Sequence, residues 1–443
     1  MARRRRKVLP PDPIELQIHA LSHDGRGVAR NAEGKTVFVY GALAGETVMA
    51  RLTQSRKGHD EADAVEVLSA SPDRVEPRCP HFGVCGGCSL QHLAPTAQVA
   101  AKQQALLDAL KHIGKVSPDT VLDPLVNASP WGYRRKARLG AKYVAKKGKV
   151  LVGFRERGTP YVTDLGECHV LHPKIAELLL PLQQLIDGLS IRDRVPQIEV
   201  AMDDSQLVLI FRVMEALTAT DHDALADFGR QHALFVYLQT GGPDTIAPLG
   251  ETAELAYVLP AFDLTLRFLP SDFTQVNTDI NRQMVSRALD LLEVGPDEQV
   301  LDLFCGVGNF TLPLAKRARR VVGVEGDAGL VERARANAEL NGLDNVGFHV
   351  ANLYEDLERP PWLGEHYDKV LLDPPRSGAL EVLEHLPKLG AKRLVYVSCY
   401  PGTLARDAGE LVHKLGYRLL AAGVMDMFPH TAHVESIALF ERR

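Results

Sequence analysis

The chain has 443 residues, of which 45% are hydrophobic, and its formal net charge at pH 7 is −5. This length is sufficient for two or three domains with cores of their own. The sequence contains no run of about 18 apolar residues, which excludes a membrane-spanning helix. The basic N-terminus MARRRRKVLPPDPIEL lacks the apolar segment of a secretory signal. We therefore expect a cytoplasmic protein without a membrane partner.

Residues 10–70 predict a small β-barrel. Short stretches of alternating apolar and polar residues are separated by glycines, as in IELQIHALSHDGRGVAR. Residues 1–60 also carry 11 lysines and arginines against 6 acidic residues. A small barrel with basic loops is a common RNA-binding module, although the run RRRRK taken alone is equally consistent with a solvated tail.

Three cysteines within ten residues follow the predicted barrel. The linker 71–94 contains RCPHFGVCGGCSLQHL, in which Cys79, Cys85 and Cys88 have the spacing C-x5-C-x2-C. Six cysteines in a chain of this length are too sparse for a disulfide framework, and clustered cysteines in a reducing compartment are more often metal ligands or catalysts. A tetrahedral site needs a fourth ligand, and Cys168 remains once the two cysteines of the C-terminal domain are set aside. Four thiolates fit zinc or a [4Fe–4S] cluster, and the spacing leaves both open.

Residues 95–265 mix helical and strand patterns, which indicates a central α+β domain. Helical periodicity covers residues 95–112 and ends near a glycine, and a second helical pattern covers residues 173–189. Residues 131–157 carry ten basic residues against one acidic residue and alternate with apolar ones. We interpret this stretch as a twisted hairpin with one basic face that contacts RNA.

From about residue 266 to residue 443, strands alternate with helices, which is typical of a doubly wound parallel sheet. The segment VLDLFCGVGNF predicts a strand that ends at Phe304, a glycine-bearing turn and a helix, and the next strand ends at Glu325. This is the pattern of an adenosine-type cofactor site, in which a carboxylate accepts hydrogen bonds from ribose hydroxyls. A dinucleotide site usually has a third glycine where this chain has Thr311. S-adenosylmethionine (SAM) has no pyrophosphate, so it is favoured over NAD and over a purely structural turn.

Three further residues follow predicted strands at the same sheet edge. Asn352 follows the third strand, Asp373 in DPPRSG follows the fourth, and Cys399 follows the fifth. A lone cysteine is more often structural, but a thiolate beside a methyl donor is a candidate nucleophile. Adding a thiolate to C6 of uracil makes C5 reactive toward a methyl group, and a base must then remove the C5 proton. Glu435, at the start of the last predicted strand, is placed for that task.

The segments DLFCGVGNF, DPPRSG, VYVSCYPGTLARD and HVESIALF together resemble the RNA 5-methyluridine methyltransferases. Along nearly the whole chain the sequence looks most like the bacterial members that methylate uracil in 23S ribosomal RNA. The resemblance implies that Cys399 is the nucleophile and Glu435 the proton acceptor. It implies six SAM contacts: Gln275, Phe304, Asn309, Glu325, Asn352 and Asp373.

The resemblance also bears on the remaining parts of the chain. It implies a class I (Rossmann-like) SAM-dependent methyltransferase domain at residues 266–443, preceded by a TRAM-like (OB-like) barrel and the central domain. It favours a [4Fe–4S] cluster over zinc at Cys79, Cys85, Cys88 and Cys168, and we expect that cluster to be structural. A tRNA target is less expected, because the relatives that act on tRNA lack the barrel and the cluster.

Two other functions are consistent with parts of the pattern. A small-molecule methyltransferase would share the cofactor site, but it would not need an RNA-type barrel and two basic regions. A non-catalytic RNA-binding or ribosome assembly factor could retain the fold, but it would not need Asp373, Cys399 and Glu435 together. The sequence leaves open which uridine of 23S rRNA is methylated and whether one or two sites are served.

Overall fold

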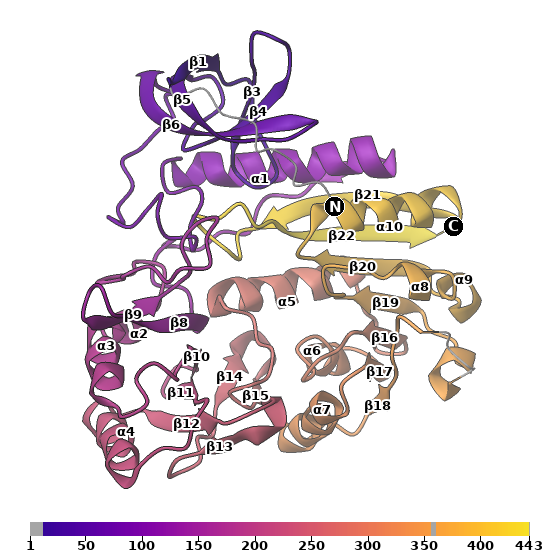
Figure 1. Ribbon diagram of the computed structural model, residues 1–443. Helices are drawn as coiled ribbons and strands as arrows, with labels where there is room; N and C mark the ends of the chain where they lie inside the picture. The colour runs from indigo at the N-terminus through magenta and orange to yellow at the C-terminus, as the bar shows by residue number, and fades with distance from the viewer. Residues whose placement is uncertain (1–11, 356–359, 443) are drawn as a thin grey trace, which may run out of the picture. The chain divides into compact units, whose positions relative to one another are not determined.

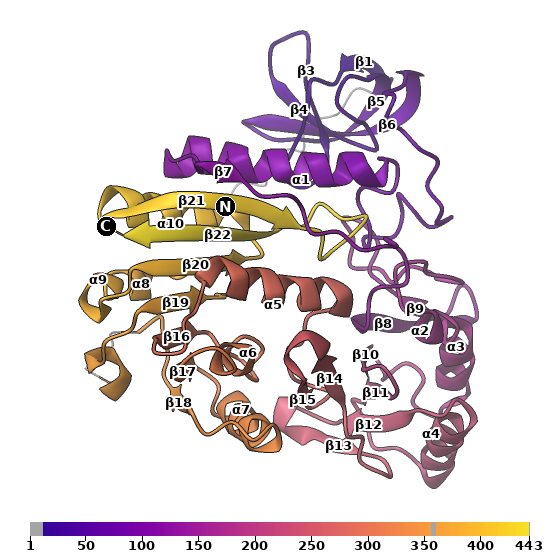
Figure 2. The ribbon, with the colours of Figure 1, turned by 180° about the vertical axis from the view of Figure 1, so that it is seen from behind.

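The computed structural model describes residues 12–355 and 360–442 (Figures 1 and 2). The chain forms two compact units. The first contains the described residues up to Lys102 together with Glu156–Thr159 and Pro429–His433, and the second contains the rest. The basic run at residues 3–7 lies outside the described residues. Among the helices of the described segments, none is both long and apolar enough to cross a membrane.

The first unit contains a six-stranded sheet with the strand order β1-β5-β6-β4-β3-β2. Its strands are β1 (Ile14–Gln17), β2 (Ala20–Leu21), β3 (Gly27–Arg30), β4 (Thr36–Tyr40), β5 (Thr47–Ser55) and β6 (His59–Ser69). Alternate residues along these short strands point inward, and Leu16, Val37, Val39 and Val48 are buried in one cluster. The alternation that predicted the strands therefore also selects the core.

The helix α1 (Pro95–Ala109) continues into a π-helical turn (Leu110–Gly114), in agreement with the predicted helix. The division between the two units falls within α1, after Lys102.

The central part of the second unit is a six-stranded sheet with the order β13-β12-β11-β10-β8-β9. Its strands are β8 (Lys136–Val144), β9 (Lys149–Gly153), β10 (Gln197–Met202), β11 (Leu207–Arg212), β12 (Phe235–Gln239) and β13 (Ile246–Pro248). The helices beside it are α2 (Pro173–Ala176), α3 (Leu179–Gly188) and α4 (Ala219–Gln231). A separate hairpin follows, formed by β14 (Ala256–Leu259) and β15 (Leu264–Arg267).

The helical pattern predicted over residues 173–189 forms two helices, because α2 and α3 are separated by a turn. Pro181 explains the interruption. Proline has no backbone N–H, and it is best tolerated in the first turn of a helix, where no intrahelical partner is required. In α3, which begins at Leu179, Pro181 occupies that first turn.

The remainder of the second unit is built on an eight-stranded sheet with the order β18-β17-β16-β19-β20-β22-β21-β7. Its strands are β7 (Thr120–Val121), β16 (Gln299–Leu303), β17 (Arg320–Glu325), β18 (Val346–Val350), β19 (Lys369–Leu372), β20 (Arg393–Ser398), β21 (Tyr417–Met425) and β22 (Glu435–Arg442). Its helices are α5 (Thr278–Leu292), α6 (Thr311–Ala315), α7 (Ala328–Leu340), α8 (Leu380–Leu383), α9 (Leu386–Leu389) and α10 (Pro401–His413). Strands β16 to β20 are parallel, and β22 runs antiparallel to both β20 and β21. This is the predicted doubly wound sheet with a final antiparallel pair.

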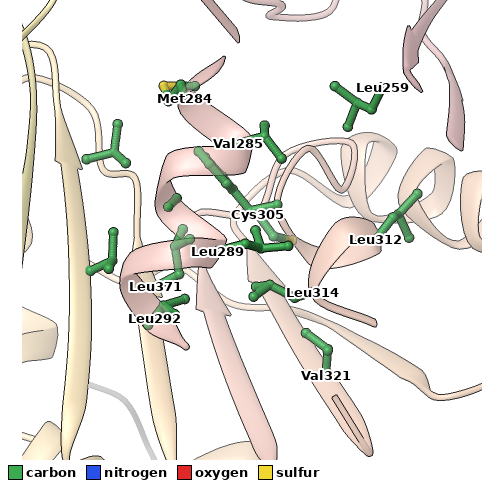
Figure 3. Close-up of a cluster of buried hydrophobic side chains, with 14 of the residues drawn as sticks. Leu259, Met284, Val285, Leu289, Leu292, Cys305, Leu312, Leu314, Val321 and Leu371 are labelled. Atoms are coloured by element: carbon green, nitrogen blue, oxygen red, sulfur yellow. The ribbon is translucent and has the colours of Figure 1, made fainter. Parts of the chain in front are cut away.

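A continuous apolar core fixes α5 and α6 to this sheet (Figure 3). Met284, Leu289 and Leu292 of α5 are completely buried, as are Leu312 of α6 and Leu371 of β19. Truncating a buried leucine to alanine typically costs about 2 to 5 kcal/mol. This core therefore holds the helices and strands that carry the site rigidly in place.

Candidate active site

A cavity of about 590 Å³ opens at the carboxyl edge of the eight-stranded sheet. It is lined by all eight residues that the sequence predicts for catalysis and cofactor binding: Gln275, Phe304, Asn309, Glu325, Asn352, Asp373, Cys399 and Glu435. Its size lies within the range of about 300 to 1,000 Å³ that is usual for small-molecule sites.

The sheet topology explains why these residues converge. Successive parallel strands run outward in one direction from β16 and in the other from β19, so the order reverses between them, which is where ligands bind in open α/β sheets. Glu435 reaches the same edge by a different route. Because β22 is antiparallel to β20, with Ser436 paired to Ser398, the first residue of β22 lies beside the last residues of β20. Glu435 and Cys399 are thereby brought into one cavity.

The turn after β16 contains residues with positive φ, a conformation that allows the backbone to approach a ligand closely. The strand ends at Leu303, one residue before the predicted end, because Phe304 has a left-handed φ of 66°. Gly306 also has a positive φ, of 55°, and the position that a Cβ would occupy there has no heavy atom within 4 Å. Gly306 therefore leaves open space on the cavity side of the turn.

Glu325 fixes this turn to the start of the next helix. One carboxylate oxygen accepts a hydrogen bond from the backbone N–H of Gly306 at 3.1 Å. The other accepts from the N–H groups of Gly326 at 2.7 Å and Asp327 at 3.1 Å. A carboxylate has about four acceptor positions, so Glu325 still has capacity to accept from the hydroxyls of a ribose.

Thr311, the residue that stands where a dinucleotide site has its third glycine, forms a buried hydrogen bond. Its hydroxyl donates to Asp302 at 2.5 Å. Burial is the largest cause that raises the pKa of Asp302, the Thr311 bond lowers it and the charges of Asp373 and Glu325 raise it, and the net pKa is about 8. The start of α6 is thus tied to the interior of the sheet.

Burial shifts the pKa of three residues of the cavity: the predicted cofactor contact Asp373 and the predicted catalytic residues Cys399 and Glu435. Burial raises the pKa of Asp373 to about 7 and that of Glu435, which is only 3% exposed, well above its usual range. Burial also raises the pKa of the Cys399 thiol to about 11, and the negative charge of Glu435 adds to this effect. A nearby guanidinium, that of Arg376, opposes both increases. Arg376 therefore favours the thiolate of Cys399 and the carboxylate of Glu435.

Several residues of the cavity were not predicted from the sequence. Besides Arg376 of the DPPRSG segment, the wall includes five aromatic residues: Tyr257, Phe273, Phe310, Tyr354 and Phe428. Phe273 is 72% exposed, and the rings of Phe304 and Tyr354 lie 5.7 Å apart. Exposed aromatic side chains at the rim of an RNA-modifying site are candidate stacking surfaces for bases. Arg376 in DPPRSG and Phe310 in DLFCGVGNF were usable signals, because both lie in segments that carry the family resemblance.

These features fit SAM. The open face of Gly306 and the fixed carboxylate of Glu325 suit an adenosine, and buried carboxyl groups suit a sulfonium cation. The fit rests on this chain's own residues and needs no phosphate-binding group.

The predicted metal ligands are distributed over both units. Cys79, Cys85 and Cys88 belong to the first unit and Cys168 belongs to the second. Within residues 12–355 and 360–442, no group of three or more His, Cys, Asp or Glu side chains is arranged to hold a metal ion. A local feature does favour charge on one sulfur: the backbone N–H of Gly87 donates to the Sγ of Cys85 at 3.4 Å. The cluster stays a prediction.

The basic hairpin forms as predicted, from β8 and β9, but much of its charge is paired within the protein. The ion pairs are Arg135–Asp204 at 2.5 Å, Arg138–Glu199 at 2.8 Å, Lys147–Asp164 at 3.3 Å and Lys149–Asp164 at 2.9 Å. The charge count of the sequence therefore overstates the positive face. A contact with RNA stays a prediction for the exposed residues Lys142 and Lys146.

Comparisons with known proteins agree with this geometry. The family model for tRNA (uracil-5-)-methyltransferases matches residues 258–357 and 363–443, and that for the TRAM domain matches residues 13–65. The crystal structure of the tRNA (uracil-54, C5)-methyltransferase of Pyrococcus abyssi, in complex with S-adenosyl-L-homocysteine, is similar with a TM-score of 0.74 at 25% identity. That match covers 96% of this chain and 100% of the archaeal one. The fold and the site define a Rossmann-like SAM-dependent methyltransferase.

Relatives that match along the full length of the chain identify its family more specifically. The chain is 58% identical to the Alkalilimnicola ehrlichii protein named 23S rRNA (uracil(1939)-C(5))-methyltransferase RlmD, over 100% of this chain and 99% of the relative. It is 54% identical to the protein of the same name from Methylococcus capsulatus, over 99% of each chain. The chain belongs to the RlmD family of 23S rRNA uracil-C5 methyltransferases.

Proposed function

We propose that the protein transfers a methyl group from SAM to C5 of one uridine in 23S rRNA, at the position equivalent to the uracil 1939 named in its relatives. The observation that carries the proposal is the convergence of Cys399 and Glu435 in the cavity that also contains Gly306 and Glu325. A nucleophile and a base beside an adenosine-type site are the requirements of this reaction.

Cys399 acts first. Its thiolate forms a bond to C6 of the uracil, and the electrons of the C5=C6 double bond move toward the O4 carbonyl to give an enolate. When bound, SAM supplies an electrophilic methyl group to C5. Arg376 assists because its positive charge lowers the pKa of Cys399 against the raising effect of burial.

Glu435 completes the reaction. Its carboxylate takes the C5 proton, the electrons of that C–H bond re-form the C5=C6 double bond, and the sulfur of Cys399 leaves C6. Burial makes this carboxylate a stronger base once it is ionised, because the same desolvation raises its pKa. The nearby guanidinium of Arg376 favours the ionised form that the step requires.

The target base must leave its stack to reach a cavity at a sheet edge. The TRAM-type sheet at residues 13–65 supports a grip on the surrounding RNA, because such small barrels bind looped or single-stranded RNA. Binding would then weaken steeply with salt. Ribosomal RNA as substrate also implies the cytoplasmic location that the sequence predicts.

For the cysteines, we propose a [4Fe–4S] cluster held by Cys79, Cys85, Cys88 and Cys168. Four thiols are the donor set that such clusters use, and the Gly87–Cys85 hydrogen bond supports a thiolate at one of them. Protein purified without oxygen should contain about four iron and four sulfide per chain, and Cys168→Ser should lose both. Stoichiometric zinc without sulfide would contradict the cluster.

The proposed reaction is tested with 23S rRNA that contains 5-fluorouridine. Fluorine cannot leave C5 as a proton, so the adduct should persist after methyl transfer as a protein–RNA band that resists denaturation. Cys399→Ala should abolish the band, whereas Glu435→Gln should keep it, because no proton is removed in this substrate. Folded wild-type protein that binds SAM but gives no band would contradict the covalent mechanism.

A further inference from the structure

One wall of the cavity is a loop rather than a helix or strand end. Residues 268–277, between β15 and α5, contain no regular secondary structure except an isolated bridge at Asn277. This loop contributes Phe273, Thr274 and Gln275 to the cavity (Figure 1 labels the flanking elements). A loop wall can support catalysis only if something holds it in place.

A buried carboxylate lies at the centre of the loop. Asp272 is only 5% exposed, although it precedes the highly exposed Phe273. Its Oδ2 accepts a hydrogen bond from the backbone N–H of Leu269 at 2.7 Å, and its own N–H donates to the carbonyl of Leu269 at 2.9 Å. These two bonds close the loop on itself.

The first cation on Asp272 comes from α7. The guanidinium of Arg333 lies 2.6 Å from Oδ1 and 2.5 Å from Oδ2, so it contacts both carboxylate oxygens. Nη2 donates a hydrogen bond to Oδ1, whereas Nε and Oδ2 form an ion pair without hydrogen-bond geometry. Because α7 follows the strand that ends at Glu325, Arg333 connects the loop to the part of the sheet that faces the cofactor.

The second cation comes from the central domain. Lys136, the first residue of β8, donates from Nζ to the backbone carbonyls of Pro270, at 3.3 Å, and of Asp272. The preceding residue extends this connection, because the backbone N–H of Arg135 donates to the carbonyl of Val276 at 3.0 Å. The strand that begins the basic hairpin thus contacts the loop on both sides of Phe273.

We propose that Lys136 and Arg333 act through Asp272 as positioning residues that hold Phe273, Thr274 and Gln275 against the substrate and cofactor. The proposal rests on the proposed function, since it assigns those three residues to the methyl-transfer site. One consequence is that the methyltransferase domain does not form this wall alone, because Lys136 belongs to the central domain.

The main test substitutes Asp272→Asn, which keeps the shape of the side chain and removes its charge. Hydrogen exchange in residues 268–277 should become at least about tenfold faster in this variant, and kcat/KM for the RNA should fall about 10- to 100-fold, since small misplacements of positioning groups cost that much. The matched control is Asp221→Asn, because Asp221 is equally buried but caps α4 in the central domain. The control should lower the melting temperature without changing either quantity.

Lys136 adds a pH signature that a merely structural contact would not give. Burial is the largest cause that lowers its pKa, Asp272 and Glu199 raise it and Arg138 lowers it, and the net pKa is about 8. The ammonium is therefore charged at pH 7 and neutral at pH 9. The ratio of kcat/KM between wild type and Lys136→Met should be about tenfold at pH 7 and smaller at pH 9, because the neutral amine can still donate to the carbonyls but no longer carries its charge. The ratio cancels every titration that the two proteins share.

Two outcomes would overturn the inference. One is unchanged exchange and unchanged kcat/KM in Asp272→Asn, and the other is a Lys136→Met ratio that does not depend on pH. If Asp272→Asn does not fold, Arg333→Lys tests the same contact, because it keeps the positive charge and loses the guanidinium that donates to Oδ1. The hydrogen-exchange measurement does not depend on activity. A wild-type protein that binds no SAM and methylates no RNA would refute the proposed function, but hydrogen exchange would still test whether Asp272 holds the loop.

Discussion

The side chains of Asn281 and Asn309 exchange two hydrogen bonds, each of 3.0 Å. The hydroxyl of Tyr257 donates a further bond of 3.0 Å to the same oxygen of Asn309. The carbonyl of Asn309 therefore uses both of its lone pairs within the protein, and its amide keeps only one free N–H. Asn309, predicted as a cofactor contact, serves in addition to anchor the turn that follows β16 to α5.

This pairing predicts an indirect effect on cofactor binding. Asn281→Ala removes both bonds without touching the cavity, and two ordinary hydrogen bonds correspond to roughly a tenfold loss of affinity for SAM. Calorimetric titration with SAM measures it. Asp290→Ala, an exposed position on the same helix, should leave the affinity unchanged. An Asn281→Ala protein that binds SAM as tightly as wild type would show that the turn holds its shape without α5.

Substitution of Glu325 should weaken SAM binding more than substitution of Asn281 does. In Glu325→Gln, one of the two oxygens becomes an NH2 group, which faces backbone N–H groups that it cannot bond. If Glu325 binds the ribose as predicted, loss of each charged hydrogen bond lowers the affinity for SAM by about 10- to 100-fold. We expect SAM binding to weaken by at least that factor, with the melting temperature of the free protein changed much less. A larger loss of stability than of affinity would make Glu325 a structural residue.

Glu435→Gln should stop the reaction after methyl transfer. With ordinary RNA, Cys399 can still add to C6 and C5 can still receive its methyl group, but no carboxylate removes the C5 proton. A methylated protein–RNA adduct should therefore accumulate, detectable by denaturing electrophoresis with labelled SAM. The double variant Cys399→Ala/Glu435→Gln should give none. Normal turnover by Glu435→Gln would show that another group acts as the base.

The sequence was sufficient for the residues that follow strands. Glu325, Asp373 and Cys399 each end or follow a parallel strand, and parallel strands present their carboxyl ends at one edge, so their convergence follows from the pattern alone. Glu435 required one more inference, that the last strand is antiparallel, and the pairing of Ser436 with Ser398 agrees with it.

Contacts between residues far apart in the chain were not predictable in this way. Asn281 and Tyr257 meet Asn309, and Lys136 meets the loop of Asp272, through packing that no local pattern encodes. The count of basic residues overstated the positive charge of the hairpin face for a related reason. Composition registers the ten basic residues of the hairpin but not partners such as Asp204 and Glu199, which lie about 60 to 70 positions later.

The buried carboxyl groups predict an unusual pH dependence of stability. Burial raises the pKa of Asp302 to about 8 and that of Asp373 to about 7, whereas unfolded aspartates titrate near about 4. Between these limits the folded protein binds more protons than the unfolded chain, so this contribution to stability is lost as pH rises from about 4 to 8. Thermal melts of the free protein should show the decline, and Asp302→Asn, which keeps an acceptor for Thr311, should reduce it.

The same groups predict that SAM and its product respond differently to pH. The sulfonium of SAM is a cation that favours ionised carboxyl groups, whereas S-adenosylhomocysteine has a neutral thioether at that position. From pH 6 to 7.5, as Asp373 passes its pKa of about 7, the affinity for SAM should rise several-fold and the affinity for S-adenosylhomocysteine should stay nearly constant. Calorimetry in two buffers of different ionisation enthalpy should also detect proton release with SAM alone. Asp373→Asn should flatten the SAM profile. Parallel profiles for the two ligands would mean that the carboxyl groups do not sense the sulfonium, and cofactor discrimination would then have to come from shape.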